Sequence, residues 1–232
     1  MNPVVTHEQW LAERKELLAK EKAFTRQRDE LTRQRRELPW ERVDKEYVFE
    51  GAAGPRSLSD LFDGRSQLVV YHFMFGPDWE EGCKSCSFWA DNFDPNVVHL
   101  KARDVTMVAV SRAPYDKLAA YKERMGWGFD WFSSGDSDFN FDFGVSFPPE
   151  QLEEAGAYNY GSLPARVEER EGMSVFFKDA NGEVFHTYSA YARGIDLLNT
   201  AYNYLDLVPK GRDEEGLPQA QSWVRRHDEY GE

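Results

Sequence analysis

Hydrophobic positions follow a seven-residue repeat at the start of the chain. Within a largely charged stretch, residues 7–38 carry an apolar side chain at every seventh position: Trp10, Leu17, Phe24, Leu31 and Leu38. Thr6, followed three residues later by Gln9, is typical of a helix start, and Pro39 ends the pattern. The repeat predicts one long helix whose narrow apolar stripe can contact another surface but cannot form a core by itself.

From residue 66 onward, short apolar runs alternate with segments of helical spacing. Residues 67–75 form a nearly continuous apolar run, typical of a parallel strand buried on both faces, and Gly76 and Pro77 end it. The turn sequence from Asp179 to Gly182 separates two apolar runs and predicts a hairpin. The expected elements are a strand at 46–49, a turn at 51–55, a strand at 67–75, a helix at 85–102 kinked at Pro95, a strand at 105–110, a helix at 115–125, a strand at 129–133, hairpin strands at 174–177 and 183–188, and a helix at 195–205.

The stretch 134–172 is rich in Gly, Ser, Asp, Pro and aromatic residues and predicts an irregular excursion. Within it, acidic and aromatic residues alternate over 136–143, which indicates a half-buried strand. The alternation of strands and helices predicts an α/β fold with a central mixed sheet flanked by helices. The expected organisation is an N-terminal helical extension at 1–45, an α/β domain at 46–208 and a polar C-terminal tail at 209–232.

The net charge of the chain argues against one class of function, general nucleic-acid binding. Its 232 residues contain 28 Lys and Arg against 41 Asp and Glu, giving a net charge of −13. Residues 1–50 are neutral overall, so the acidic excess lies in the remainder. General nucleic-acid binding is not expected, because phosphate contacts need clustered cations. The basic residues over 20–36 make the N-terminal helix either a solvated face or a docking face for an acidic partner, including a second copy of the chain.

No stretch approaches 18 consecutive apolar residues, so no membrane span is expected. The first sixteen residues are polar and lack the apolar segment of a secretory signal. These features predict a cytoplasmic protein.

The two cysteines, Cys83 and Cys86, are spaced C-x-x-C between a buried strand and a helix. The start of a helix presents free N–H groups that stabilise a thiolate, and Lys84 adds a nearby positive charge. We expect Cys83 to be the exposed nucleophile and Cys86 to be the less exposed resolving thiol. A metal site is the alternative, although none of the five histidines has ligand spacing with the cysteines.

Three segments resemble one bacterial thioredoxin-like family: residues 38–40, residues 71–79 and residues 82–91, the last of which includes both cysteines. The family was long catalogued as a domain of unknown function, and its members are labelled dithiol-disulfide oxidoreductases. The resemblance runs through nearly the whole chain, including the basic N-terminal helix and residues 225–230. It implies a thioredoxin-like fold and thiol–disulfide exchange at Cys83 and Cys86.

The resemblance also implies roles for residues outside the cysteine loop. Thioredoxins carry a cis-proline before the first hairpin strand, and here Met173 stands at that position, where its thioether would suit Cu(I) beside two thiols. A buried proton-transfer acid of thioredoxins maps to Tyr71 or His72. The threonine and proline that precede the reactive cysteine of peroxiredoxins are Glu80 and Gly76 here, so the peroxidase motif is absent.

The leading prediction is a dithiol-disulfide oxidoreductase that acts on a protein or small-molecule disulfide and is reset by an external thiol reductant. No organic cofactor is expected, because no glycine-rich phosphate loop is present. Two alternatives remain open at this stage. One is a metal-handling module for Cu(I) or zinc that uses the same cysteines, and the other is a redox-sensing interaction module.

Overall fold

The computed structural model describes residues 2–135, 137–153 and 157–231. The chain divides into two compact units, Met1–Pro39 and Trp40–Glu232. The second unit contains both cysteines, and the residues of the predicted polar tail that the structure describes belong to it as well.

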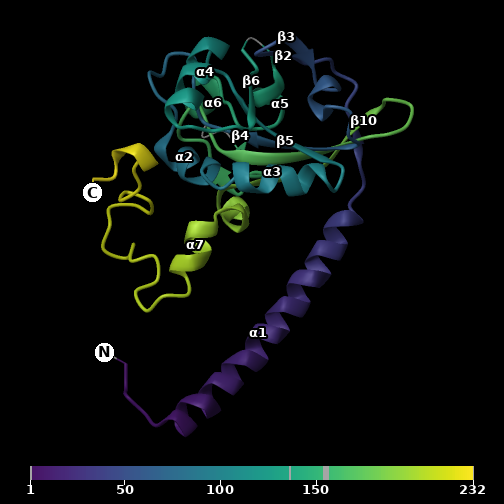
Figure 1. Ribbon diagram of the computed structural model, residues 1–232. Coiled ribbons are helices and arrows are strands. Elements are labelled where there is room, and N and C mark those ends of the chain that lie inside the picture. The colour runs from purple at the N-terminus through teal and green to yellow at the C-terminus, as the bar shows by residue number, and fades with distance from the viewer. Residues whose placement is uncertain (1, 136, 154–156, 232) are drawn as a thin grey trace. The chain divides into compact units, whose positions relative to one another are not determined.

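The first unit is built on the helix α1 (His7–Arg36), which confirms the long helix expected from the heptad spacing (Figure 1). Thr6 and Gln9 form the capping box at its start, and Arg33, Arg35 and Arg36 occupy its last turn, where cations interact favourably with the helix dipole. The helix buries none of its own residues. Within the described part of the chain, no helix combines the length and apolar character that crossing a membrane requires.

The second unit is organised around an eight-stranded mixed sheet with the order β1-β10-β9-β4-β5-β6-β2-β3. The central strands β4, β5 and β6 are parallel, whereas β9, β10 and β1 on one side and β2 and β3 on the other pair antiparallel. The strands are β1 (Glu41–Arg42), β2 (Val48–Gly51), β3 (Gly54–Ser57), β4 (Gln67–His72), β5 (Val105–Ser111), β6 (Asp130–Ser133), β9 (Gly172–Lys178) and β10 (Val184–Tyr191).

Helices and short turns cover both faces of this sheet (Figure 1). A separate two-stranded ladder joins β7 (Ala157–Tyr158) to β8 (Leu163–Pro164). The helical elements are η1 (Asp60–Phe62), α2 (Lys84–Ala90), α3 (Asp94–Lys101), α4 (Tyr115–Arg124), α5 (Phe139–Asp142), α6 (Pro149–Glu153), η2 (Ala192–Leu198), α7 (Thr200–Leu205) and η3 (His227–Glu229).

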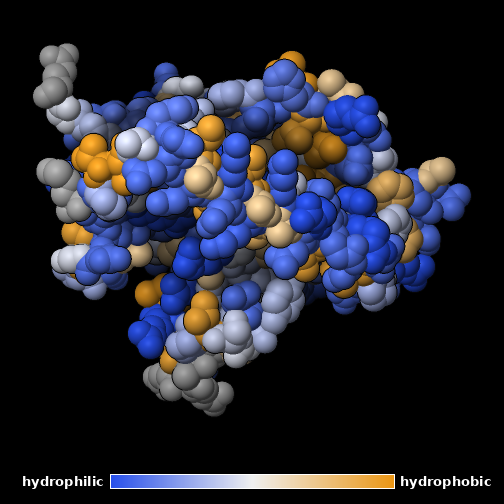
Figure 2. Space-filling view, turned by 90° about the horizontal axis from the view of Figure 1, so that it is seen from below, coloured by the Kyte–Doolittle hydropathy of each residue, from blue (hydrophilic) through white to orange (hydrophobic). Residues whose placement is uncertain are grey.

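Alternate side chains of β4 supply two separate hydrophobic cores. Tyr71 belongs to the core formed with α2 and α4, whereas Leu68 and Val70 belong to the core on the opposite face, which includes Phe139 of α5. Successive side chains of a strand point to opposite faces, so a strand covered on both sides is apolar at nearly every position. The continuous apolar run in the sequence therefore correctly indicated a central strand. On the outside, one face of the molecule shows hydrophobic residues in several separate patches among hydrophilic ones (Figure 2).

The central parallel strands, the helix at 115–125 and the hairpin are confirmed in type, with boundary shifts of a few residues. Three expectations were wrong. The helix predicted for 85–102 is two helices, α2 and α3, and Pro95 lies in the first turn of α3, where its missing N–H has no partner to lose. The strand predicted for 136–143 is the helical turn α5, because its aromatic residues pack together under the sheet; Asp136 lies outside the described residues. The helix predicted for 195–205 is η2 followed by α7, with Asn199 capping α7.

Candidate active site

The two cysteines lie where the chain passes from β4 into α2. Cys83 immediately precedes α2, and Cys86 lies in its first turn. The N–H of Cys83 donates to the carbonyl of Met74 (3.0 Å), and the N–H of Met74 donates to the sulfur of Cys86 (3.4 Å). Gly82 permits the close turn, because a Cβ there would lie 2.8 Å from the ring of Phe73. These contacts hold the cysteine loop against the end of the strand.

The two thiols differ in exposure and in acidity. Cys86 is buried, with 2% of its surface exposed, whereas Cys83 is half-buried. A hydrogen bond from the Cys86 thiol lowers the pKa of Cys83 to about 7, with help from the backbone N–H groups of Cys86 and Ser85 and against the effects of burial and the charge of Glu171. Burial raises the pKa of Cys86 well above its usual value, and its hydrogen bond to Cys83 adds to the increase. Near neutral pH, about half of Cys83 is thiolate while Cys86 stays protonated.

We therefore expect iodoacetamide to alkylate the reduced protein at one cysteine, with a rate that rises with pH around a midpoint of about 7. Peptide mapping should place the label on Cys83, and Cys83→Ser should remove the fast reaction. A midpoint near 9, or labelling of Cys86 at the same rate, would contradict the assigned difference between the thiols.

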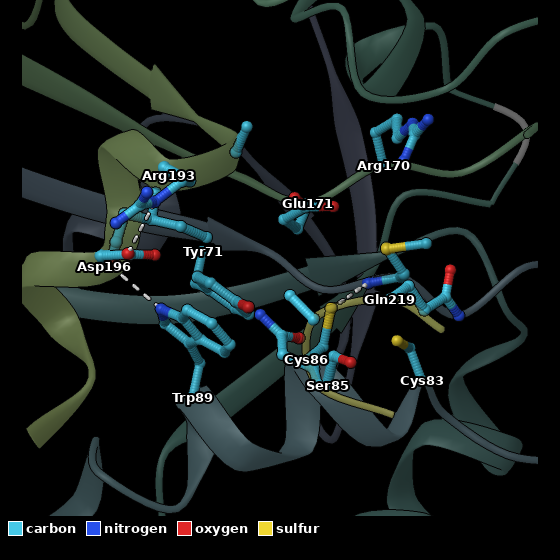
Figure 3. A pocket seen from close by; sticks show the side chains of 15 residues that line it. Tyr71, Cys83, Ser85, Cys86, Trp89, Arg170, Glu171, Arg193, Asp196 and Gln219 are labelled. Carbon is cyan, nitrogen blue, oxygen red and sulfur yellow. Dashed lines mark hydrogen bonds and ion pairs between the residues drawn. The ribbon is translucent and has the colours of Figure 1, made fainter. Parts of the chain in front are cut away.

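A cavity of about 410 Å³ lies beside the dithiol (Figure 3). Its floor comes from the end of β4 and from α2, and both sulfurs contribute to it. Its walls come from three segments that are distant in sequence: the loop before β9, the beginning of η2, and residues 219–221 near the C-terminus. Cys83 therefore lines an open cavity that only the tertiary structure assembles.

Glu171, in the loop before β9, lines this cavity and carries no signal in the sequence, where it is one of several charged residues in a row. Burial raises the pKa of its carboxyl group. Burial also raises the pKa of Cys86, and the charge of Glu171 increases it further. The charge of Glu171 therefore makes a small contribution that raises the pKa of both thiols, beside the larger effects of burial and of the cysteines on each other.

Tyr71 occupies the same face of β4 as the dithiol and also lines the cavity. Its ring extends toward Cys86 (Figure 3). The hydroxyl is buried and forms no hydrogen bond of normal geometry with any described residue. Burial raises the pKa of Tyr71, and the nearby Cys86 sulfur contributes to the rise. Tyr71 therefore presents a protonated hydroxyl to the cavity.

The segment near the C-terminus packs against the cysteine loop. The polar sequence of this segment gives no indication of that contact. The guanidinium of Arg226 donates to the carbonyl of Gly82 (2.9 Å) and to the hydroxyl of Tyr121 (2.7 Å), and it forms an ion pair with Glu81 (2.9 Å). Trp223 packs edge-on against Phe88 of α2, with the ring centres 5.5 Å apart. These contacts hold residues 219–221 in the wall of the cavity.

A family model described as "Bacterial protein of unknown function (DUF899)" matches residues 1–230. The chain belongs to this family. The match confirms the resemblance seen in the sequence. No match was found among curated proteins.

Solved structures similar to this DUF899 protein show its fold. Peroxiredoxin Q from Xanthomonas campestris has a TM-score of 0.50 and 13% identity, covering 73% of this chain and 97% of that chain. Peroxidoxin BcpB from Mycobacterium tuberculosis has a TM-score of 0.48 and 16% identity, covering 70% of this chain and 94% of that chain. The DUF899 protein has the thioredoxin-like fold expected from its sequence, with a central mixed sheet and a long N-terminal helix.

Lys84 begins α2, but its side chain is directed away from the dithiol. Its ammonium group donates to the carbonyl of Ser222 (3.4 Å), and Lys84 is not among the residues that line the cavity. The thiolate of Cys83 is stabilised instead by the Cys86 thiol and by backbone N–H groups. Lys84 therefore contributes a contact to the C-terminal segment of the DUF899 protein.

His72 lies on the face of the sheet opposite the dithiol. Its ring packs against Phe139 and Phe143, and its Nε2 lies 2.8 Å from the hydroxyl oxygen of Ser174. Hydrogen bonds continue from Ser174 through Ser189 to His186. Burial lowers the pKa of His72 to about 3, so the ring is neutral. The structure does not bring His72 to the cysteines.

Met173 lies in β9, where it pairs with Tyr71. It is buried in the same hydrophobic core as Cys86, but the methionine that lines the cavity is Met74. No cis peptide bond precedes either residue in the described chain. The described residues also contain no group of three or more His, Cys, Asp or Glu side chains that could hold a metal ion. The structure therefore places Met173 in the core and not in the lining of the cavity beside Cys83 and Cys86.

Proposed function

We propose that this DUF899 protein is a dithiol-disulfide oxidoreductase in which Cys83 is the nucleophile and Cys86 is the resolving thiol. One observation carries the proposal: two neighbouring thiols have opposite properties, since Cys83 has a lowered pKa and is partly exposed, whereas Cys86 has a raised pKa and is buried. The thiolate is the nucleophile in disulfide exchange, and an attacking thiol is most effective when its pKa lies near the ambient pH. The fold, which places the pair at the start of α2, supports the same chemistry.

The proposed reaction proceeds in two exchanges. The Cys83 thiolate attacks a substrate disulfide, forms a mixed disulfide and releases the first substrate thiolate, which takes a proton from solvent. Cys86 then transfers its proton to the Glu171 carboxylate and attacks the Cys83 sulfur, and the second substrate sulfur leaves as a thiolate. That thiolate takes up the proton from Glu171, which becomes a carboxylate again. The substrate gains two electrons and the protein gains a Cys83–Cys86 disulfide. An external dithiol then reduces that disulfide and completes the cycle.

Replacing Cys86 by serine tests the order of these steps. The variant retains the Cys83 thiol but has no resolving thiol, so a mixed disulfide with oxidised glutathione should accumulate on Cys83 and persist in the absence of reductant. Intact-protein mass spectrometry measures the adduct, and the wild-type protein should instead end as the internal disulfide. An unmodified Cys86→Ser protein after prolonged incubation would count against exchange at this site.

A further inference from the structure

The cavity beside Cys83 has the dimensions of a small-molecule site. Its volume of about 410 Å³ falls within the range of about 300–1,000 Å³ that is typical of ligand pockets. Residues 219–221 and the beginning of η2 wall the thiol on the side away from the sheet. Gln221 is fixed there by a hydrogen bond from its N–H to Glu214 (2.9 Å). The cavity is open on one side, so a small disulfide can enter it and lie beside Cys83 against a wall that is held in place.

Charged groups from the loop before β9 face this cavity. Arg170 and Glu171 are neighbours in sequence, and both line the cavity (Figure 3). The carbon at the centre of the Arg170 guanidinium lies 5.3 Å from the centre of the Tyr158 ring, and its Nε is buried without a hydrogen-bond partner. Burial raises the pKa of the neighbouring Glu171 carboxyl and the charge of Arg170 lowers it, but among the described residues no carboxylate forms an ion pair with Arg170. A buried donor without a partner costs free energy unless a ligand supplies an acceptor.

The other charged residues of the cavity are already paired. Asp196 accepts from Arg193 (3.3 Å) and from Arg212 (3.1 Å). Arg170 and Arg193 are the two cations of the lining that can bind a carboxylate, and Arg170 is the one that has a buried nitrogen without a partner. Glu171 can bind an ammonium group. A guanidinium binds a carboxylate with two parallel hydrogen bonds, which gives both affinity and orientation.

We propose that the substrate of the dithiol is a low-molecular-weight disulfide built from amino acids, with a carboxylate bound by Arg170 and its disulfide presented to Cys83. This inference rests on the proposed oxidoreductase function and adds the substrate class. The redox step is the one given above: two electrons pass from the two thiols to the small disulfide, which leaves as two thiols. The net charge of −13 repels anions at long range, so a preference for a carboxylate-bearing disulfide must arise from local contacts in the cavity.

The test compares two small disulfides in single-turnover reactions with the fully reduced protein. Oxidised glutathione carries carboxylates and amino groups, and hydroxyethyl disulfide carries neither. Formation of the Cys83–Cys86 disulfide is followed by quenched thiol counting and by the intrinsic tryptophan fluorescence, to which Trp89 in the cavity contributes. We expect the wild-type protein to react about tenfold faster, or more, with oxidised glutathione than with hydroxyethyl disulfide. A rate ratio of this size corresponds to the free energy of one hydrogen bond between charged groups.

Arg170→Gln should lower the rate with oxidised glutathione more than the rate with hydroxyethyl disulfide, so that the ratio of the two rates falls toward one, and Arg170→Lys should retain part of the preference. Arg103→Gln is the matched control, since it removes the same charge from an exposed position outside the cavity. Circular dichroism shows that the variants are folded, and the rate with the uncharged disulfide measures any change in the dithiol itself, by which the rate with oxidised glutathione is divided.

Two kinds of failure can be told apart. If hydroxyethyl disulfide oxidises the pair but oxidised glutathione has no advantage, the substrate class is wrong and the oxidoreductase function stands. A faster reaction with the disulfides of insulin than with either small molecule would likewise overturn the substrate class in favour of proteins. If none of these compounds oxidises the pair, the proposed function itself fails.

Discussion

Replacing Cys83 by serine is expected to lower the rate of catalysed disulfide reduction by at least about a thousandfold. The serine hydroxyl is not ionised near neutral pH, so the nucleophile is lost. Cys86 cannot replace it, because its sulfur is buried and its pKa is raised well above the usual value. The assay is the oxidation of dithiothreitol by oxidised glutathione, with the uncatalysed rate subtracted.

Comparison with Cys86→Ser makes this experiment decisive. That variant should complete the first exchange at a rate within a few fold of the wild-type rate and then stop, whereas Cys83→Ser should not begin. Circular dichroism establishes that both variants are folded, since serine is close to cysteine in size. Residual catalysis by Cys83→Ser within tenfold of the wild-type rate would show that another group is the nucleophile. If both variants lost the first exchange to the same extent, the assignment of Cys83 as nucleophile and Cys86 as resolving thiol would be wrong.

The second large effect concerns the dependence of stability on pH. His72 is fully buried and its pKa is lowered to about 3 in the folded protein, because burial disfavours the charged ring, with a smaller contribution from His186. In the unfolded chain a histidine has a pKa of about 6.5. Below that value the unfolded state binds a proton that the folded state does not, so acidification favours unfolding.

Above a pH of about 6.5, His72 is neutral in both states and does not lower the free energy of unfolding. As the pH falls from about 6.5 to about 3, protonation of His72 in the unfolded chain lowers that free energy progressively. The loss is about 1.4 kcal/mol per pH unit and about 5 kcal/mol over the whole interval. Burial raises the pKa values of the Glu169 and Glu171 carboxyl groups, so the folded protein binds these protons more tightly than the unfolded chain does. At these two residues, acidification therefore raises the free energy of unfolding, opposite to its effect at His72. The effect of His72 must therefore be isolated by substitution.

His72→Gln is the variant to use, because its amide can still form a hydrogen bond with Ser174 and does not titrate. Between pH 7 and pH 4 its free energy of unfolding, measured with urea, should fall by about 3 kcal/mol less than that of the wild-type protein. His99→Gln, at an exposed position in α3, is the matched control for replacing a histidine. An identical pH slope in His72→Gln and the wild-type protein would show that His72 is not held neutral by the fold.

Local patterns in the sequence determined the central elements of this protein. The apolar run at 67–75 identified the central strand, because burial on both faces removes the polar positions from a strand. The cysteine loop lies between that strand and a helix, so its redox interpretation needed only neighbouring residues. The cap formed by Thr6 and Gln9 and the turn from Asp179 to Gly182 were recognisable for the same reason.

The side of the sheet on which each residue lies was decided by the tertiary structure. Tyr71 and His72 were equivalent candidates in the sequence, since a shift of one residue exchanges the two faces of a strand. The pairing of β4 with β5 and β9 directs Tyr71 toward the dithiol and His72 toward Phe139. The segment at 136–143 alternates like a strand but forms α5, because packing of its aromatic side chains outweighs the local pattern.

The residues that surround the dithiol could not be predicted from the sequence either. Arg170, Glu171 and residues 219–221 belong to charged or polar stretches that read locally as loop and tail, and they meet Cys83 only through contacts between distant segments. Arg226 reaches the carbonyl of Gly82 across 144 positions of the chain. The sequence by itself determined that this protein carries a C-x-x-C dithiol at the start of a helix in a thioredoxin-like fold. The acidity of that dithiol and the charges of its cavity depend on burial and on long-range neighbours, which exist only once the chain has folded.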